Sequence, residues 1–197
     1  MVRTLDPERR QKFLDTARKL FVANGVSNTS TAEIAKEAGT AAGTLFLYFP
    51  TKQALIDELI LTVAREQSEQ ILQKLSPALS ARDSFLAIWD TTLHWFVDHP
   101  EAYRYVRQVR DSGLVSETVV QESNQFFGYY YQAIQKGLAE GVIKPYPVEL
   151  IGNTMYHQIV AVTDILIRLP DATEHEEFIQ KGFDIFWDGI RKRHARE

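Results

Sequence analysis

Apolar residues recur at three- and four-residue steps along almost the whole chain, and hardly any stretch alternates between apolar and polar positions as a half-buried strand would. This pattern predicts helices at residues 7–24, 31–39, 41–49, 52–75, 81–98, 101–111, 115–140, 147–169 and 174–194. Glycine or proline lies at most of the breaks between them, and both residue types end helices. We therefore predict an all-α protein.

Residues at the predicted helix ends fit this division. Serine, threonine and aspartate side chains accept hydrogen bonds from the unpaired N–H groups at a helix start, and the chain places such residues before four helices. They are Asp6, Ser30 or Thr31, Thr40 and Thr51. Gly25 and Gly39 stand where the first two helices are expected to end, because glycine readily adopts the backbone conformation that terminates a helix.

Two short helices with a tight turn between them are predicted at residues 31–49. Ala35, Ala38 and Gly39 are small enough to let the two backbones approach closely at the turn, while Leu45 and Phe49 anchor the second helix. The remaining positions form an almost uncharged outer surface, made of Thr40, Ala41, Ala42, Gly43, Thr44, Phe46, Leu47 and Tyr48. Small, uncharged side chains permit approach to base edges in a DNA groove. We interpret the segment as a helix-turn-helix.

The net charge of −4 gives no general sign of nucleic-acid binding, but the charge is divided unevenly. Residues 1–52 contain eight basic and five acidic residues, a net +3, whereas the rest has 14 basic and 21 acidic residues, a net −7. The positive part coincides with the helix-turn-helix. The chain has no cysteine, so neither a disulfide nor a thiolate metal site is expected. No window approaches the roughly 18 apolar residues of a membrane span, and no leader is evident, so we expect a cytoplasmic protein without a membrane partner.

The N-terminal segment resembles the signature of TetR/AcrR-type transcriptional regulators, over about residues 7–60. The resemblance is carried by Thr31, Ile34-Ala35, Ala38-Gly39, Gly43, Leu45, Tyr48-Phe49, Lys52 and Leu55, which fall in register together. It implies a three-helix DNA-binding domain at residues 1–52, a connecting helix at about 52–75, and a helical ligand-binding and dimerisation domain at 53–197. It also implies a homodimeric repressor that binds a palindromic double-stranded operator and is released by a small-molecule effector.

The resemblance further implies which residues lie at the DNA. These are Thr31, Thr40, Ala41, Ala42, Gly43, Thr44, Phe46, Leu47, Tyr48 and Lys52. Tyr48 and Lys52 would contact phosphates, and residues 41–47 would lie nearer the bases. The chain departs from the family where Val-Ser is common, since it has Thr40-Ala41, and where tyrosine is frequent, since it has Phe46. Each departure removes a hydroxyl group, so substitutes are expected among Thr40, Thr51 and Arg3.

Plainer roles stay open for some of these residues. Tyr48 fits a core aromatic as well as a phosphate contact, although its hydroxyl needs a polar partner. Lys52 fits an ordinary surface lysine, although a cation in the first turn of a helix opposes the helix dipole and favours an anionic partner. Arg3, Arg9 and Arg10 fit either a solvated terminus or an arm along the DNA backbone.

The remainder of the chain is rich in aromatic residues, and some of them could line an apolar ligand pocket. The predicted lining is Trp89, Phe96, Tyr103, Phe126, Phe127 and Tyr130, with Asn153 and His157 as polar groups. For any single aromatic residue, and for His157, a core or interface role is the simpler interpretation. The expected effector is a small apolar or aromatic molecule.

The last two predicted helices are apolar enough to cover more surface than one chain buries, which predicts a dimer interface. The predicted interface residues are Ile151, Met155, Ile159, Val162, Phe183, Trp187 and Ile190. The family resemblance implies the same pairing, through a four-helix bundle.

Two other classes of protein are alternatives to a DNA-binding regulator. An enzyme is disfavoured, because the sequence has no phosphate loop or nucleophile elbow, and His94 and His99 do not share a helix face for a metal. No catalytic residue, metal or cofactor is therefore expected. A helical protein-interaction adaptor that binds no specific DNA sequence is the remaining alternative.

Overall fold

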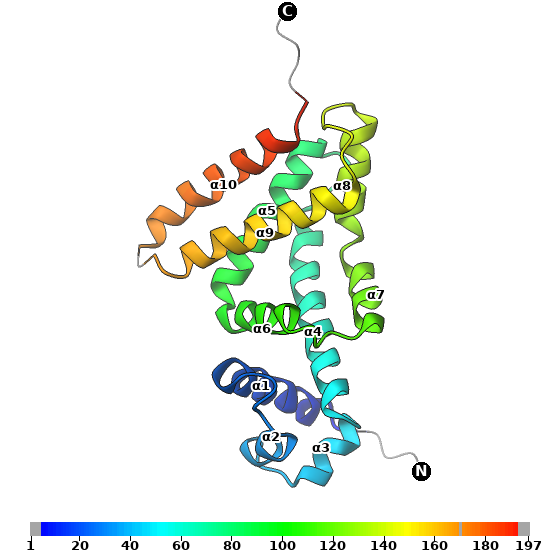
Figure 1. Ribbon diagram of the computed structural model, residues 1–197, viewed down its shortest axis with the longest axis vertical. Coiled ribbons are helices and arrows are strands. Elements are labelled where there is room, and N and C mark those ends of the chain that lie inside the picture. Colours follow the sequence, from blue (N-terminus) through cyan, green and yellow to red (C-terminus); the bar gives the residue numbers. More distant parts are fainter. Residues whose placement is uncertain (1–4, 170, 193–197) are drawn as a thin grey trace, which may run out of the picture. The chain divides into compact units, whose positions relative to one another are not determined.

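The computed structural model describes residues 5–169 and 171–192, and this part of the chain is almost wholly helical (Figure 1). Its helices are α1 (Pro7–Asn24), α2 (Thr31–Glu37), α3 (Ala42–Tyr48), α4 (Lys52–Lys74), α5 (Ala81–Asp98), α6 (Pro100–Asp111), α7 (Glu117–Phe126), α8 (Gly128–Ala139), α9 (Val148–Leu166), the 3-10 helix η1 (Ala172–Glu174) and α10 (His175–Ile190). The all-α prediction is confirmed. Among the described helices, none has the length and apolar character needed to cross a membrane.

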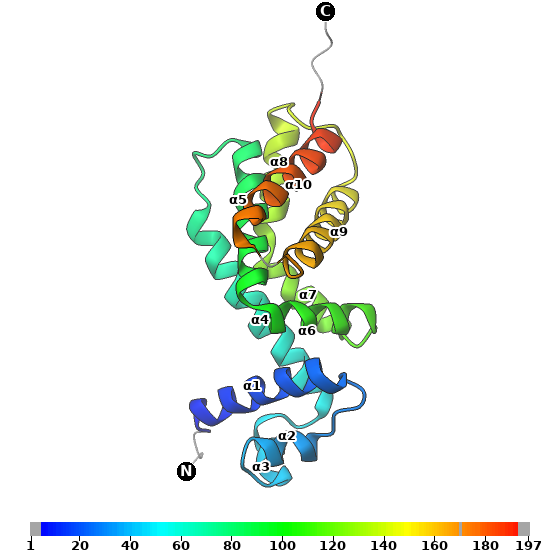
Figure 2. The same cartoon turned by 90° about the vertical axis from the view of Figure 1, so that its left-hand side faces the viewer.

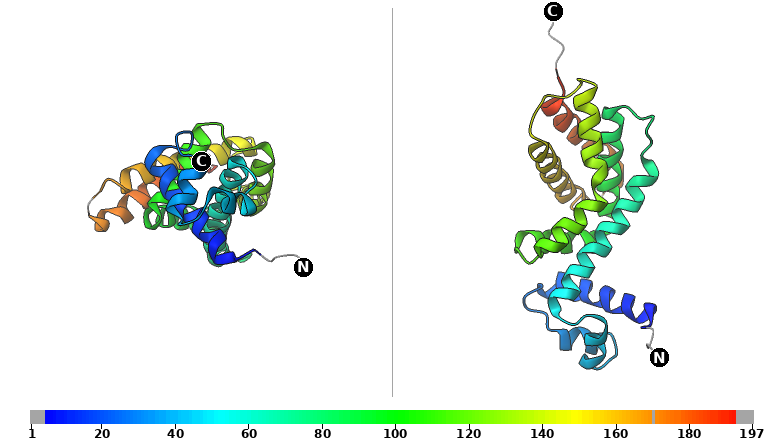
Figure 3. Two further views of the ribbon diagram at one scale, coloured as in Figure 1. Left: turned by 90° about the horizontal axis from the view of Figure 1, so that it is seen from below. Right: turned by 90° about the vertical axis from the view of Figure 1, so that its right-hand side faces the viewer.

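The chain divides into two compact units, and each contains two separate stretches of sequence. The first unit combines Met1–Ala64 with His99–Ser123, and the second combines Arg65–Asp98 with Asn124–Glu197. The division falls within α4, which is nevertheless one uninterrupted helix (Figure 3). The predicted boundary after residue 52 separates the residues expected to bind DNA from the rest, whereas the two units are defined by packing. The predicted boundary therefore stays a prediction.

The first unit is built around the apolar face of α1. Phe13, Leu14, Ala17 and Phe21 are fully buried at the helical spacing seen in the sequence. Helix α6 closes this core, although it follows α5 in the chain. Its Tyr105 stacks on Phe21 with ring centroids 6.0 Å apart.

Two hydrogen bonds fix α6 to its neighbours in the first unit. The Tyr105 hydroxyl donates to the carbonyl oxygen of Ile56 on α4 at 2.9 Å, and the Gln108 amide donates to the carbonyl of Val22 on α1 at 3.3 Å. Burial raises the pKa of Tyr105, with a further contribution from Asp57, so the hydroxyl stays protonated and keeps its donor role. Helices α1, α4 and α6 therefore form one packed group.

The core of the second unit lies among α5, α8, α9 and α10 (Figure 2). Trp89 on α5 is fully buried, its ring stacks on Phe186, and its indole N–H donates to the carbonyl of Ile179 at 2.9 Å. The backbone of α10 comes close to this tryptophan at Gly182. A Cβ atom there would lie 2.8 Å from the Trp89 ring and 2.9 Å from Val162. The close approach of α10 to α5 and α9 thus requires glycine.

The predicted helix at residues 115–140 is wrong in one respect, because the structure breaks it at Phe127 into α7 and α8. The Ser68 hydroxyl on α4 donates to the carbonyl of Phe126 at 2.8 Å. The N–H of Tyr130 donates to the carbonyl of Phe127, three residues back instead of the four of an α-helix. Gly128 is also a weak helix former, by about 1 kcal/mol relative to alanine. A tertiary hydrogen bond at a weak position therefore ends α7.

Replacing Gly182 by alanine should lower the free energy of unfolding by about 1–3 kcal/mol, because the added methyl group has to displace the buried Trp89 ring or Val162. Gly189→Ala is the matched control on the same helix, since its Cβ would meet nothing within 4 Å. The control should be neutral or should stabilise the protein by up to about 1 kcal/mol through helix propensity. Urea denaturation followed by circular dichroism measures both. Equal effects of the two substitutions would contradict the packing described for α10.

Candidate nucleic-acid interface

Helices α2 and α3 pack against each other through a small apolar contact. In α2, Ile34 and Ala35 are buried, and so is Ala38 at its C-terminal end. In α3, Leu45 is buried, and so is Phe49 at its C-terminal end. Ser30 caps α2, since its hydroxyl accepts the N–H of Glu33 at 3.1 Å. These contacts produce the helix-turn-helix expected from the small residues at the turn.

The turn between the two helices depends on Gly39, whose φ of +76° lies in the left-handed region that favours glycine. Thr40 follows it, but the prediction that Thr40 caps the next helix is wrong. Ala41 is the N-cap of α3 and offers no side-chain hydrogen bond, while the Thr40 hydroxyl donates back to the carbonyl of Ala35 at 3.3 Å. Thr40 therefore closes α2. Thr51, by contrast, accepts the N–H of Ala54 at 3.0 Å, as expected at the start of α4.

The solvent-facing side of α3 is apolar. Leu47 is 64% exposed and Phe46 is 42% exposed, although both are large hydrophobic residues. Gly43 is also exposed, and nothing lies within 4 Å of the position a Cβ would take. Ala42 and Thr44 are half-buried. A partner can therefore approach both the side chains and the backbone of this helix closely.

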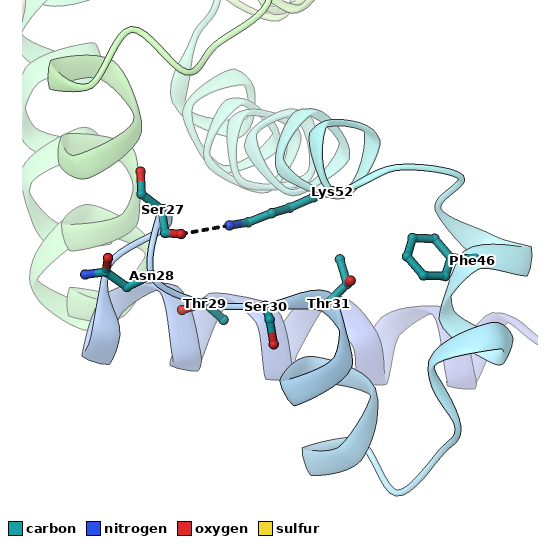
Figure 4. A pocket seen from close by; sticks show the side chains of 7 residues that line it. All are labelled: Ser27, Asn28, Thr29, Ser30, Thr31, Phe46 and Lys52. Atoms are coloured by element: carbon teal, nitrogen blue, oxygen red, sulfur yellow. Dashed lines mark hydrogen bonds between the residues drawn. The ribbon is translucent and has the colours of Figure 1, made fainter.

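An open hollow of about 390 Å³ lies beside α3, between the start of α2 and the start of α4 (Figure 4). It is lined by Ser27, Asn28, Thr29, Ser30, Thr31, Phe46 and Lys52. The Lys52 ammonium donates to the carbonyl of Ser27, but at 3.4 Å this hydrogen bond is long. An ammonium has three donors, so Lys52 retains donors for an anion in the hollow. Thr29 has a structural role, because its buried hydroxyl donates to the carbonyls of Leu20 and Gly25.

Tyr48 combines a packing role with a polar one. Its ring lies edge-on to Phe13, with centroids 5.4 Å apart, and its hydroxyl oxygen accepts the N–H of Asp6 at 3.2 Å. The acceptor side of the hydroxyl is thus used within the first unit. The hydroxyl hydrogen is what Tyr48 can offer to a phosphate oxygen.

The basic residues of α1 fall into different positions. Arg10 pairs with Glu58 and lies over the Phe49 ring, so it serves packing between helices. Arg9 is exposed, and Arg3 lies outside the described residues. Lys12 was missed by the sequence reasoning. Its Nζ atom lies 3.8 Å from the position of a Cβ on Gly39, which places a cation beside the turn of the helix-turn-helix.

The residues predicted to line an effector pocket do not come together as a set. Trp89 and Phe96 are buried in the second unit, whereas Tyr103 is buried in the first. Phe126, Phe127 and Tyr130 belong to the second unit and are half-buried.

The two polar groups predicted for the pocket, Asn153 and His157, are both exposed. The cause is the phase of α9, which turns Ile151, Met155 and Ile159 inward and carries residues 153 and 157 to the solvent side.

Other polar groups are buried in the second unit. Gln67 is 7% exposed, Ser68 2% and Tyr129 5%. The amide nitrogen of Gln67 has no hydrogen-bond partner within the part of the chain that the structure describes, and the hydroxyl of Tyr129 makes no hydrogen bond of good geometry there, although the Ser68 side chain is close enough to lower its pKa. Burial raises the pKa of Tyr129, with a further contribution from Tyr130, and Ser68 offsets this only in part, so the hydroxyl is a neutral donor. Sequence reasoning missed these residues, because their burial is set by tertiary packing.

The predicted dimer-interface residues occupy the chain's own core. Ile151, Met155, Ile159, Val162, Phe183, Trp187 and Ile190 are each at most 9% exposed. The predicted residues therefore lie on the inward faces of α9 and α10, and the dimer interface stays a prediction. The outward face of α9 and α10 exposes other large apolar side chains, namely Leu150, Ile165, Phe178 and Ile185.

One cluster in the second unit combines metal-ligand types, namely Asp90 and His94 on α5 and Glu176 on α10. The His94 ring nitrogens lie 2.9 Å from the carbonyl oxygen of Asp90 and 3.0 Å from the Glu176 carboxylate. Burial alone lowers the pKa of His94, but these hydrogen bonds outweigh it, so the pKa is raised above its ordinary value. Both ring nitrogens are thus occupied, and the arrangement suits an imidazolium that braces α5 against α10.

Comparisons with known proteins cover nearly the whole chain. Residues 13–59 match the family described as bacterial regulatory proteins, tetR family, and residues 61–192 match the tetracyclin repressor-like C-terminal domain. A tetR-family transcription regulator from Shewanella sp. PV-4 has a similar structure, with a TM-score of 0.87 and 30% identity over 94% of this chain and 99% of that chain. One from Marinobacter aquaeolei VT8 has a TM-score of 0.82 and 24% identity over 94% of this chain and 96% of that chain.

A relative with a similar sequence is also a transcriptional regulator. The HTH-type transcriptional regulator SrpR of Pseudomonas putida is 27% identical over 192 residues, which cover 94% of this chain and 86% of that protein. Both halves of the chain are thus accounted for by one family, and its members are regulators of transcription and not enzymes. The chain belongs to the TetR family of DNA-binding transcriptional regulators.

Proposed function

We propose that this TetR-family regulator is a repressor that binds a palindromic operator as a homodimer and is released by a small apolar or aromatic effector. The observation that carries the proposal is the surface of α3, where exposed apolar residues lie beside a hollow that contains Lys52. This combination suits a helix in the major groove with a cation at the neighbouring phosphate. Residues 1–52 carry a net +3 in a chain of net −4, which supports DNA as the partner of this part of the chain.

The predicted DNA contacts fall into two groups on this proposal. Lys52 and Tyr48 contact phosphates. Thr31 lines the same hollow as Lys52, and Lys12 is added as a further cation at the turn. The groove-facing group is Thr40, Ala41, Ala42, Gly43, Thr44, Phe46 and Leu47.

The exposed apolar face of α9 and α10 supports a homodimer. Ile185 is 67% exposed and Leu150 53%, and two such helices from each chain can cover one another in a four-helix arrangement. Twofold pairing would present two copies of α3, which is why a palindromic operator is expected.

Two buried polar groups of the second unit support the effector proposal. The Gln67 amide nitrogen and the Tyr129 hydroxyl make no hydrogen bond of good geometry among the described residues, and an unsatisfied buried donor costs about 1–3 kcal/mol. An acceptor group of a bound molecule would pair with the Tyr129 hydroxyl, whose ring stacks on Tyr130 and lies edge-on to Phe127. We propose that the effector's polar group binds here, so that these residues take the role that the sequence analysis gave to Asn153 and His157. Helix α4 contributes residues to both compact units, so it offers a covalent route from this site to the DNA-binding head.

Duplexes selected from a random-sequence library should bind the full chain with an affinity that falls steeply with salt, as for any protein that neutralises DNA phosphates. Lys52→Ala should weaken binding to all duplexes alike and lower the slope of log K against log[salt] by about 2 for a dimer, which is about one phosphate per head. Tyr48→Phe should also weaken all duplexes alike, whereas Thr44→Ala should change the preference among them. Gel shifts at several salt concentrations measure this. A helical adaptor would give no sequence-specific shift.

Ile185→Asp should convert the dimer to a monomer at micromolar concentration, because it places a charge on each side of the proposed interface. Leu72→Asp is the matched control, since Leu72 is 54% exposed but lies on α4. Sedimentation velocity distinguishes the two states. A wild-type chain that sediments as a monomer would overturn the dimer and, with it, the palindromic operator.

Tyr129→Phe should leave the melting temperature of the effector-free protein unchanged or raise it, because the substitution deletes a buried hydroxyl that makes no hydrogen bond of good geometry. Ser68→Ala is the contrasting variant, and it should lower the melting temperature because Ser68 donates to the Phe126 carbonyl. Differential scanning calorimetry measures both. A clear loss of stability in Tyr129→Phe would show that the hydroxyl is already satisfied and would remove the basis for placing an effector there.

A further inference from the structure

Helix α3 has no side chain of the kind that usually distinguishes one base pair from another. Its sequence, AGTLFLY, contains no arginine, lysine, asparagine, glutamine or carboxylate. Those are the side chains that bond guanine, adenine and cytosine edges in the major groove, often through two hydrogen bonds at once. Thr44 and Tyr48 supply the hydroxyl groups of the helix, and the Tyr48 oxygen already accepts the N–H of Asp6. Hydrogen bonding from α3 is therefore a weak source of sequence preference.

The same helix exposes two large apolar side chains to solvent, although it is only seven residues long. Leu47 is 64% exposed and Phe46 is 42% exposed. The start of the helix adds no polar side chain, because its N-cap is Ala41 and its first two residues are Ala42 and Gly43. Covering exposed apolar surface with an apolar partner lowers the free energy, because it removes that surface from water. In the major groove, the apolar feature of a base edge is the C5 methyl group of thymine.

The charge around the helix favours DNA over a protein as the occupant of this face. Lys52 lines the same hollow as Phe46, and the Lys12 ammonium lies beside the turn that leads into α3. An apolar face with a cation at each end matches the DNA major groove, which is bordered by phosphates and contains the methyl groups of thymine. Gly43 and Ala42 add no bulk that would hold the helix away from those methyl groups.

We propose that α3 reads its operator through thymine methyl groups, with Leu47 and Phe46 as the specificity-determining side chains. The inference rests on the proposed function, since it requires α3 to lie in the major groove. It specifies the ligand chemistry of that helix: the base pairs that it contacts are A·T pairs, and their methyl groups contribute directly to affinity.

Deoxyuridine provides a direct test, because it keeps every hydrogen-bonding group of thymine and lacks only the C5 methyl. Duplexes selected by the full chain from a random library are resynthesised with deoxyuridine at one thymine position per half-site. At the contacted positions we expect a loss of about fourfold per methyl, or about 16-fold when both half-sites are changed. Positions outside the two contacted regions serve as internal controls and should show no loss.

A variant separates contact with the methyl group from its effect on DNA flexibility. Leu47→Ala should bind the thymine duplex less tightly and should lose most of the preference for thymine over deoxyuridine at one position. Phe46→Ala should do the same at a neighbouring position. Both side chains are exposed, so the variants should keep the helical circular dichroism and melting temperature of the wild type. Leu72→Ala, an exposed leucine outside α3, should keep the full preference.

The outcomes are distinguishable. If specific duplexes are selected but deoxyuridine binds as well as thymine at every position, methyl readout is wrong and the DNA-binding function stands. If Leu47→Ala and Phe46→Ala both retain the wild-type preference, the assignment to these side chains is wrong. If no specific duplex is selected, the proposed function fails and this inference fails with it.

Discussion

The packing of Tyr105 against Phe21 and Ile56 is the interaction on which the first unit, which contains the helix-turn-helix, depends. It joins α6 to α1 by ring stacking and to α4 by a buried hydrogen bond. The helix-turn-helix then packs on α1, where Tyr48 meets Phe13. Because the interior of a protein is close-packed, a shift of α6 changes what α1 and α4 can pack against. The first unit is therefore built from two separated stretches of sequence, and its core, which supports the helix-turn-helix, includes α6.

Sequence reasoning was most successful where the determining contacts are local. The helices, the caps at Asp6, Ser30 and Thr51, and the turn at Gly39 depend on neighbours within a few residues, and they were predicted. The break at Phe127 was not, because it requires a hydrogen bond from Ser68, distant in the chain.

The candidate site residues were likewise harder to predict where their environment depends on contacts distant in the sequence. Periodicity identified α9 and α10 as apolar, but it could not tell which of their apolar positions the chain buries itself. Ile151 and Phe183 were assigned to an interface although they are buried, whereas Ile165 and Ile185 are the exposed positions. The buried donors of Gln67 and Tyr129, and the cation of Lys12 beside Gly39, likewise arise only once the helices have packed.

We propose that two copies of an apolar α3, each flanked by cations, bind one palindromic operator. Hydroxyl-radical footprinting of the full chain on a selected duplex is the direct test. Two protected regions of equal strength are expected, related by a twofold axis, with their centres separated by about one helical turn, roughly 10 base pairs, or by a multiple of it. A single protected region, or protection that does not depend on sequence, would contradict it.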